Sequence, residues 1–270
     1  MQTAVERAID TMWNRYHEPL SLADMADTAI LSKFYFSRVF RTLTGTSPGR
    51  FLTAIRLTKA KQLLLETSLS VTEISYMVGY NSLGTFTSRF TRSVGVPPAR
   101  YRALSYGGIL SLPSFSGPAR GNQAGSVAGW VGVPETETPV RVYVGAFNDP
   151  IAQGVPVACD IRDGSGPYRL EALPEGQFYL RAAVVAVDDL DPNPSKRRPL
   201  FVGAAEAASV RAGRTAEADI ETRCASALDL PILLALPELD TRDASDVDLT
   251  VPVARAPLGG STAPLGAPAR

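Results

Sequence analysis

Residues 70–102 read SVTEISYMVGYNSLGTFTSRFTRSVGVPPARYR. Ser70, followed three residues later by Glu73, has the form of a capping box, which predicts that a helix begins at the next residue. Gly79 is placed to end this helix, and Ser82 is placed to cap a second one. Two short helices joined by a tight turn containing glycine are typical of a helix-turn-helix, whose second helix lies in the major groove of DNA.

The same pattern occurs once more upstream, which predicts two such units in tandem. At an offset of 50 residues, Phe36, Phe40, Gly45, Pro48 and Phe51 recur as Phe86, Phe90, Gly95, Pro98 and Tyr101. Before the turn the offset is 49, since Leu22, Met25 and Ala26 match Val71, Ile74 and Ser75. The second turn therefore carries one extra residue, which we assign to Asn81. The chain from Pro48 to about Glu66 is predicted to form one long helix that sets a spacing of about 34 Å between the two units.

These residues resemble the AraC/XylS family of transcription regulators, whose members carry two helix-turn-helix units joined by a long helix. The matching segments are Leu31-Ser32, Arg38-Val39-Phe40, Gly45-Thr46-Ser47-Pro48, Arg56-Leu57, Leu63-Leu64, Glu73-Ile74, Gly79-Tyr80-Asn81-Ser82, Gly95-Val96-Pro97-Pro98 and Tyr101-Arg102. The resemblance covers about the first 105 residues. It implies a sequence-specific transcription regulator that binds double-stranded DNA, has no enzymatic activity and needs no cofactor.

The resemblance also assigns candidate site residues. The base-facing positions are Phe34, Ser37 and Arg38 in the first unit and Leu83, Gly84, Thr85 and Ser88 in the second. The positions expected at the DNA backbone are Ser32, Arg41, Ser82, Arg89 and Arg92. For Arg41, Arg89 and Arg92, the alternative interpretation is a solvated helix face that makes no contact with DNA.

The two units differ in what they offer to bases. Among the base-facing side chains, only Arg38 can donate two hydrogen bonds to one guanine. The second unit has Ser88 where an arginine is common in the family, and Gly84 costs its helix roughly 1 kcal/mol. We therefore expect the first unit to read bases and the second mainly to hold phosphates. In the first turn, Ile30 replaces the usual small residue.

The distribution of charge divides the chain in two. Its formal net charge is zero, but residues 1–105 hold 13 Lys/Arg and 7 Asp/Glu, a balance of +6, whereas the remainder holds 14 and 20, a balance of −6. A basic first half followed by an acidic second half fits a nucleic-acid-binding domain joined to a sensing or assembly module.

The second half has the period of β-strands. Residues 106–125 are rich in Gly, Ser and Pro and are predicted to be a linker, and 126–225 to form an all-β antiparallel sandwich. Strands are predicted at 127–133, 140–147, 168–173, 178–187 and 215–222. The hairpin predicted around Leu173-Pro174-Glu175-Gly176 resembles carboxypeptidase regulatory-like (prealbumin-like) sandwiches. Residues 226–270 are expected to contain an apolar strand or packed arm, followed by a disordered tail.

Other kinds of site are weakly indicated. No catalytic constellation and no metal-spaced His/Cys set occurs, and the only histidine, His17, is interpreted as a cap or surface residue. Cys159 and Cys224 are interpreted as two buried thiols rather than a redox pair, and the Asp188/Asp189/Asp191 run as a solvated loop rather than a calcium site. Aromatic residues of the second half are interpreted as core, with a ligand pocket as the alternative: Trp130, Tyr143, Phe147, Tyr168, Phe178 and Tyr179.

The role of the predicted sandwich is left open between classes. It either forms a homodimer or contacts a partner such as RNA polymerase, or it binds a small-molecule effector, while an enzymatic role is least supported. An exposed sheet edge or apolar arm favours assembly, and an enclosed cavity with convergent polar groups favours an effector. The absence of a secretory signal and of any membrane-length apolar run predicts a cytoplasmic location without membrane contact. The operator, and activation versus repression, cannot be read from these residues.

Overall fold

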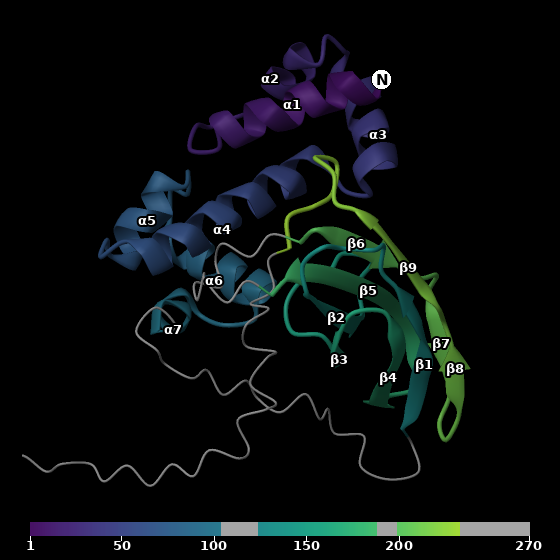
Figure 1. Cartoon of the computed structure of the whole chain (residues 1–270). Helices are drawn as coiled ribbons and strands as arrows, with labels where there is room; N and C mark the ends of the chain where they lie inside the picture. The colour runs from purple at the N-terminus through teal and green to yellow at the C-terminus, as the bar shows by residue number, and fades with distance from the viewer. Residues whose placement is uncertain (104–123, 188–198, 233–270) are drawn as a thin grey trace, which may run out of the picture.

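A computed structural model describes residues 1–103, 124–187 and 199–232 of the protein, and shows a helical half next to a half built of strands (Figure 1). The helices of the described residues are α1 (Gln2–Asn14), α2 (Leu22–Thr28), α3 (Lys33–Thr44), α4 (Pro48–Glu66), α5 (Val71–Met77), α6 (Leu83–Val94) and α7 (Pro98–Ala103). Residues 106–123 of the predicted linker lie outside the described residues, as do the tail after residue 250 and the aspartates from 188 to 191. The last residue of the predicted linker, Gly125, instead begins the first strand.

The helical half has two cores, one for each helix-turn-helix unit, and α4 contributes to both. Phe51, Leu52 and Ile55 face the core of the first unit, whereas Leu57 and Leu64 face that of the second. A helix that is apolar on more than one face must be covered on each of them. The predicted long helix is therefore confirmed, and it is the common support of both units.

The 50-residue repeat is visible in the aromatic packing. Phe36, Phe40 and Phe51 form an edge-to-face chain with ring centroids 5.4 and 5.5 Å apart. Their counterparts in the second unit form the same chain at 5.6 and 5.7 Å. Such pairs add about 0.5–1.5 kcal/mol each beyond the area that they bury. The repeat in the sequence therefore reports two copies of one core.

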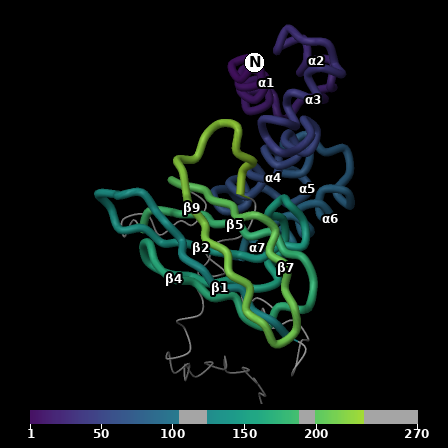
Figure 2. Tube along the Cα trace, turned by 90° about the vertical axis from the view of Figure 1, so that its right-hand side faces the viewer, coloured from purple at the N-terminus to yellow at the C-terminus, as the bar shows by residue number. Residues whose placement is uncertain are grey.

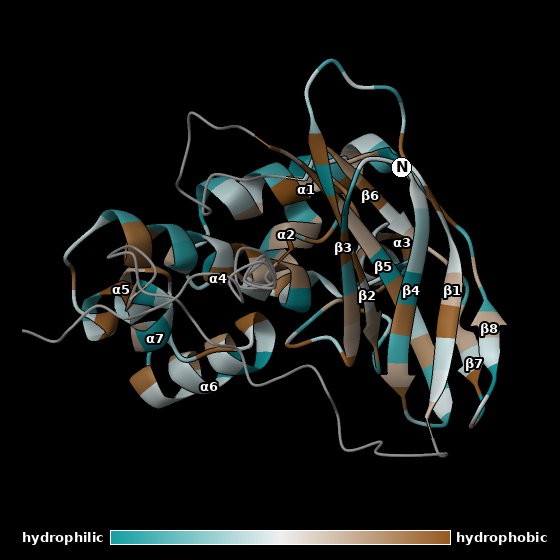
Figure 3. Ribbon diagram, turned by 60° about the horizontal axis from the view of Figure 1, so that its bottom comes forward, coloured by the Kyte–Doolittle hydropathy of each residue, from teal (hydrophilic) through white to brown (hydrophobic). Residues whose placement is uncertain are grey.

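The strands of the described residues form a nearly closed sheet around a third core. They are β1 (Gly125–Gly132), β2 (Val140–Phe147), β3 (Ala158–Asp163), β4 (Gly166–Leu173), β5 (Gly176–Ala186), β6 (Phe201–Ala204), β7 (Ala208–Val210), β8 (Thr215–Glu217) and β9 (Ile220–Cys224). The order along the sheet is β3-β2-β5-β6-β9-β1-β4, with β7 beside β5 and β8 beside β1. Figure 3 shows the apolar residues alternating along these strands.

The strand-rich second half was predicted correctly, but three details were wrong. Strand β1 pairs in parallel with β8 and β9, so the sheet is not wholly antiparallel. The single strand expected at 215–222 is divided in two. The turn at Pro174-Glu175 is not a hairpin, because β4 pairs with β1 whereas β5 pairs with β2, β6 and β7. The first and third errors concern strand pairing, which local periodicity does not specify.

Residues 226–232, hereafter the bridge, join the two halves after β9 (Figures 1 and 2). Asp229 holds the bridge to the strand: Arg223 donates to its two carboxylate oxygens at 2.6 and 2.9 Å, and the Ser226 amide donates at 2.7 Å. Leu228 packs against the core of the first unit, and Leu230 packs against both helical cores. Ile232 covers a small apolar cluster on the outer face of the sheet.

Candidate nucleic-acid interface

The second helix of each unit, α3 or α6, begins at a serine and ends at a left-handed glycine. The Ser82 hydroxyl accepts from the Thr85 amide at 3.4 Å, as a capping serine should. Ser32 holds the matching position, but its side chain makes no capping hydrogen bond, so the expected cap is present in position only. Gly45 and Gly95 end the two helices with φ of 72° and 99°.

The two turns have the same backbone hydrogen bonds, shifted by 49 residues. The Leu31 amide donates to the Ala26 carbonyl, and the Tyr80 amide donates to the Ser75 carbonyl, both at 3.0 Å. The offset becomes 50 only at the capping serines, so Asn81 is the extra residue, as predicted.

The base-facing candidates lie on the open side of both helices. The side chain of Phe34 is 92% exposed and that of Leu83 is 38% exposed. Arg38, Gly84, Thr85 and Ser88 are exposed, and Ser37 is half-buried. The backbone candidates are exposed as well: Ser32, Arg41, Ser82, Arg89 and Arg92. Exposure of the large apolar side chain of Phe34 to water is unfavourable, whereas such a side chain suits a surface that is covered by a binding partner.

The Arg38 side chain is exposed and lies over a neighbouring aromatic ring. Its guanidinium carbon lies 5.2 Å from the centroid of the Tyr35 ring, a cation–π distance. No ion pair joins Arg38 to an acidic side chain among the described residues. Its fork of N–H donors is therefore free to meet an external acceptor, and the ring restricts where it points.

The strand half contacts these helices at the end away from the base-facing residues. The Gly154 amide, in the loop between β2 and β3, donates to the Ser93 carbonyl at 2.9 Å. A Cβ on Gly95 would lie 3.0 Å from a methyl group of Val155, and one on Gly154 would lie 2.8 Å from the Arg92 carbonyl oxygen. Sequence reasoning missed this contact, because a loop that packs on a helix terminus has no periodic signal.

The residues considered for other kinds of site are partly buried and partly exposed. The described residues contain no group of His, Cys, Asp or Glu suited to a metal, and His17 is at the surface as expected. Cys159 is buried but Cys224 is exposed, which corrects the interpretation of two buried thiols. Trp130 is 51% exposed and is not core. None of the helices that the structure describes has the length and apolarity needed to cross a membrane.

Comparison with known proteins gives the same picture of the helical half. Residues 25–104 match the family model described as a helix-turn-helix domain. The HTH-type transcriptional regulator YobQ of Bacillus subtilis is 35% identical over 89 residues, which are 33% of this chain and 37% of that protein. The lactose operon transcription activator of Staphylococcus xylosus is 30% identical over 98 residues, 36% of this chain and 35% of that protein.

Among the solved structures with similarity to this chain is a transcription regulator. A regulator of Chromobacterium violaceum with an AraC-type DNA-binding domain is 30% identical over 38% of this chain and 93% of its own, with a TM-score of 0.36. The chain spans about a third of the length of the curated relatives it matches. The matched family model thus assigns residues 25–104, which lie in the helical half, to a helix-turn-helix domain.

Proposed function

We propose that this protein is a sequence-specific DNA-binding transcription regulator that acts in the cytoplasm and has no catalytic role. The observation that carries the proposal is the repeated unit: two helix-turn-helix copies on one shared helix, each with one face of the first half of its second helix exposed. The relatives that match this segment are HTH-type transcriptional regulators and activators. An excess of six positive charges in residues 1–105 suits a phosphate backbone.

Within this proposal the first unit reads bases and the second mainly grips phosphates. Arg38 supplies a bidentate donor to guanine, whereas Ser88 and Gly84 are too short to discriminate bases well. Arg41, Arg89 and Arg92 are solvent-exposed on the same two helices and would contact phosphates, which positions the protein without selecting sequence.

The strand half is proposed as the module for association, either with a second copy of the chain or with a partner such as RNA polymerase. Two copies would place four helix-turn-helix units on repeated DNA sites and raise affinity through effective concentration. The proposal includes that the strand half is a carboxypeptidase regulatory-like sandwich, on the basis of the sequence motif from Gly166 to Leu180.

The test compares three variants of the full chain on DNA selected from a random duplex library. Arg38→Ala should weaken specific binding by about 5- to 150-fold, the equivalent of about 1–3 kcal/mol, and relax the preference at one base pair. Ser88→Ala should leave the preferred sequence unchanged. Arg92→Ala should weaken all sequences alike and reduce the slope of log affinity against log salt by about 0.9.

Operators randomised under one half of the site at a time provide the decisive comparison. The asymmetry is wrong if randomising the second half costs as much affinity as randomising the first, or if Ser88→Ala shifts the preferred sequence. The whole proposal fails if the folded chain enriches no sequence from the library at low salt.

A second candidate function is effector-responsive regulation. A specific observation favours it: a cavity of about 630 Å³ lies where the two halves meet, bordered by Thr44 and Thr46 of the first unit and by Arg181 and Glu221 of the sheet. Ligand sites commonly have this size and this position between domains.

A further inference from the structure

The cavity between the two halves is bordered by two residues with unusual polar groups, Arg181 and Thr46. It is bordered by the turn after α3, the loop between β2 and β3, strands β5, β6 and β9, and the bridge, and it is partly open to solvent. Apolar side chains such as Ile151, Val202 and Ile232 supply much of its wall. A small molecule with an apolar body would therefore find both a dry surface and a few fixed polar partners there.

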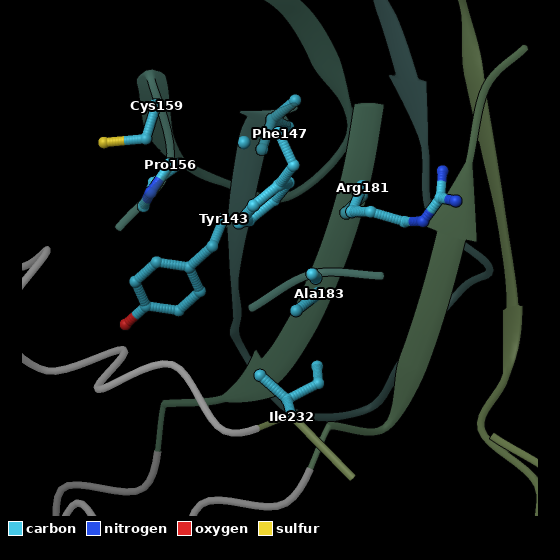
Figure 4. Close-up of a pocket in the computed structure, with 11 residues that line it drawn as sticks. Tyr143, Phe147, Pro156, Cys159, Arg181, Ala183 and Ile232 are labelled. Atoms are coloured by element: carbon cyan, nitrogen blue, oxygen red, sulfur yellow. The ribbon is translucent and has the colours of Figure 1, made fainter. Parts of the chain in front are cut away.

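The first of these groups is the guanidinium of Arg181. It donates to the carbonyl oxygens of Leu180 at 2.8 Å and of Pro150 at 2.5 Å, and no carboxylate of the described residues pairs with it. Figure 4, a close-up of a smaller neighbouring pocket, shows the Arg181 side chain extending across the sheet away from Tyr143 and Phe147, with which it shares one face of the sheet. Burial lowers the pKa of Arg181, which reflects the cost of a half-buried cation without a counter-ion.

The second group is the hydroxyl of Thr46, which follows the end of α3. Thr46 is only 3% exposed, and its Oγ1 has no hydrogen-bond partner among the described residues. Leaving a buried hydroxyl without a partner costs about 1–3 kcal/mol, so such groups are uncommon and often have a ligand or water as partner. Thr46 borders the same cavity as Arg181 but belongs to the other half of the protein.

We propose that this cavity is a binding site for a small organic monocarboxylate, whose acid group pairs with Arg181 and whose body lies against Thr46. A single negative charge is favoured over a phosphate, because the carboxylates of Glu221 and Asp229 also border the cavity. Asp229 is already neutralised by Arg223, which leaves Glu221 to repel a more highly charged anion. The apolar wall takes the rest of the ligand.

The site would couple ligand binding to DNA binding, and in this respect it rests on the proposed function. A ligand that contacts both Arg181 and Thr46 ties the sheet to the turn that ends α3, the helix that carries Arg38. It leaves the base-facing residues free, since these lie towards the start of that helix. By linkage, the factor by which the ligand changes DNA affinity must equal the factor by which DNA changes ligand affinity.

The test is a thermal-shift and calorimetric titration of the full chain with butanoate, octanoate, benzoate and phenylacetate. Butylamine and benzylamine serve as matched cations of the same shape, and inorganic phosphate as a free anion. We expect at least one carboxylate to raise Tm saturably, and neither the amines nor phosphate to do so. Arg181→Gln should weaken this binding by about 10- to 150-fold, the value for losing a hydrogen bond to a charged group.

Thr46→Val is the second variant, and it keeps the test informative if Arg181→Gln fails to fold. Because the hydroxyl that it removes has no partner, the variant should keep or raise the Tm of the free protein while binding the carboxylate about 10-fold more weakly. The proposal is overturned if no carboxylate binds, if phosphate binds as tightly as the best carboxylate, or if binding is unchanged in both variants.

Repeating the titration with the selected DNA separates the two proposals. If the chain binds a carboxylate but selects no DNA sequence, the proposed regulator function is wrong and the proposed carboxylate site stands. If the chain selects a DNA sequence but binds no carboxylate, the proposed carboxylate site is wrong and the proposed regulator function stands.

Discussion

Ile30 and Gly79 occupy the same position in the two turns and show what the repeat does not conserve. Ile30 has φ of 57° and Gly79 has φ of 85°, so both lie in the left-handed region. A β-branched residue is strained there, by about 1–2 kcal/mol, whereas glycine is not. The Ile30 side chain is 76% exposed and gains little from packing in return. The replacement of the usual small residue by Ile30 therefore makes the first turn strained.

Replacing Ile30 by a residue that tolerates this conformation should stabilise the protein. We expect Ile30→Asn to raise the free energy of unfolding by about 1 kcal/mol in urea denaturation. Gly79→Ala is the matched control and should destabilise, because its Cβ would also lie 2.9 Å from the His17 carbonyl oxygen. A neutral or destabilising Ile30→Asn would mean that the isoleucine has a packing role that outweighs its backbone strain.

At the scale of elements, the bridge is the part whose structure depends most on its surroundings. Burial raises the pKa of Asp229, but hydrogen bonds from Arg223 and Ser226 outweigh burial and hold that pKa below its ordinary value. This fixes the start of the bridge against β9, so that Leu230 reaches both helical cores. The bridge thus joins α4 and Tyr16 in contacting both units.

Truncation of that contact should loosen the junction between the halves. Leu230→Ala should lower the free energy of unfolding by about 1–2 kcal/mol, less than for a fully buried leucine because this side chain is half-buried. Amide exchange in the bridge should accelerate as well. Leu200→Ala is the control, since Leu200 is 41% exposed and should change stability little. Equal effects of the two substitutions would show that the bridge does not restrain the helices.

At the scale of the whole molecule, the sheet has one face for its own core and a second apolar cluster on its outer face. The outer-face cluster of Tyr143, Phe147, Cys159 and Val185 is buried beneath the bridge and nearby chain. Most of the open surface available for association therefore lies on the rest of the strand half, including Trp130, which is half exposed on β1. A tryptophan in such a position is typical of interfaces.

The proposed association predicts a dimer of the full chain. Sedimentation at tens of micromolar should give twice the mass of the chain, and Trp130→Ser should shift the equilibrium towards monomer. Trp130 is on the surface, so this substitution should leave the Tm nearly unchanged. A strictly monomeric wild-type chain would exclude homodimerisation and leave the partner contact or the effector role for the strands.

The sequence by itself determined the two helix-turn-helix units, the long helix between them and the strand-rich nature of the second half. These features are encoded locally, in capping serines, helix-ending glycines and apolar periods of 3.6 and 2, so neighbouring residues suffice to specify them. The exposure of Phe34 and Arg38 follows from the same helical period. Only the tertiary structure decided the parallel pairing of β1, the contact of Gly154 with α6, and the cavity that brings Arg181 to Thr46. Those residues are separated by tens of positions in the chain, and their meeting depends on which surfaces pack together, a choice that no local pattern records.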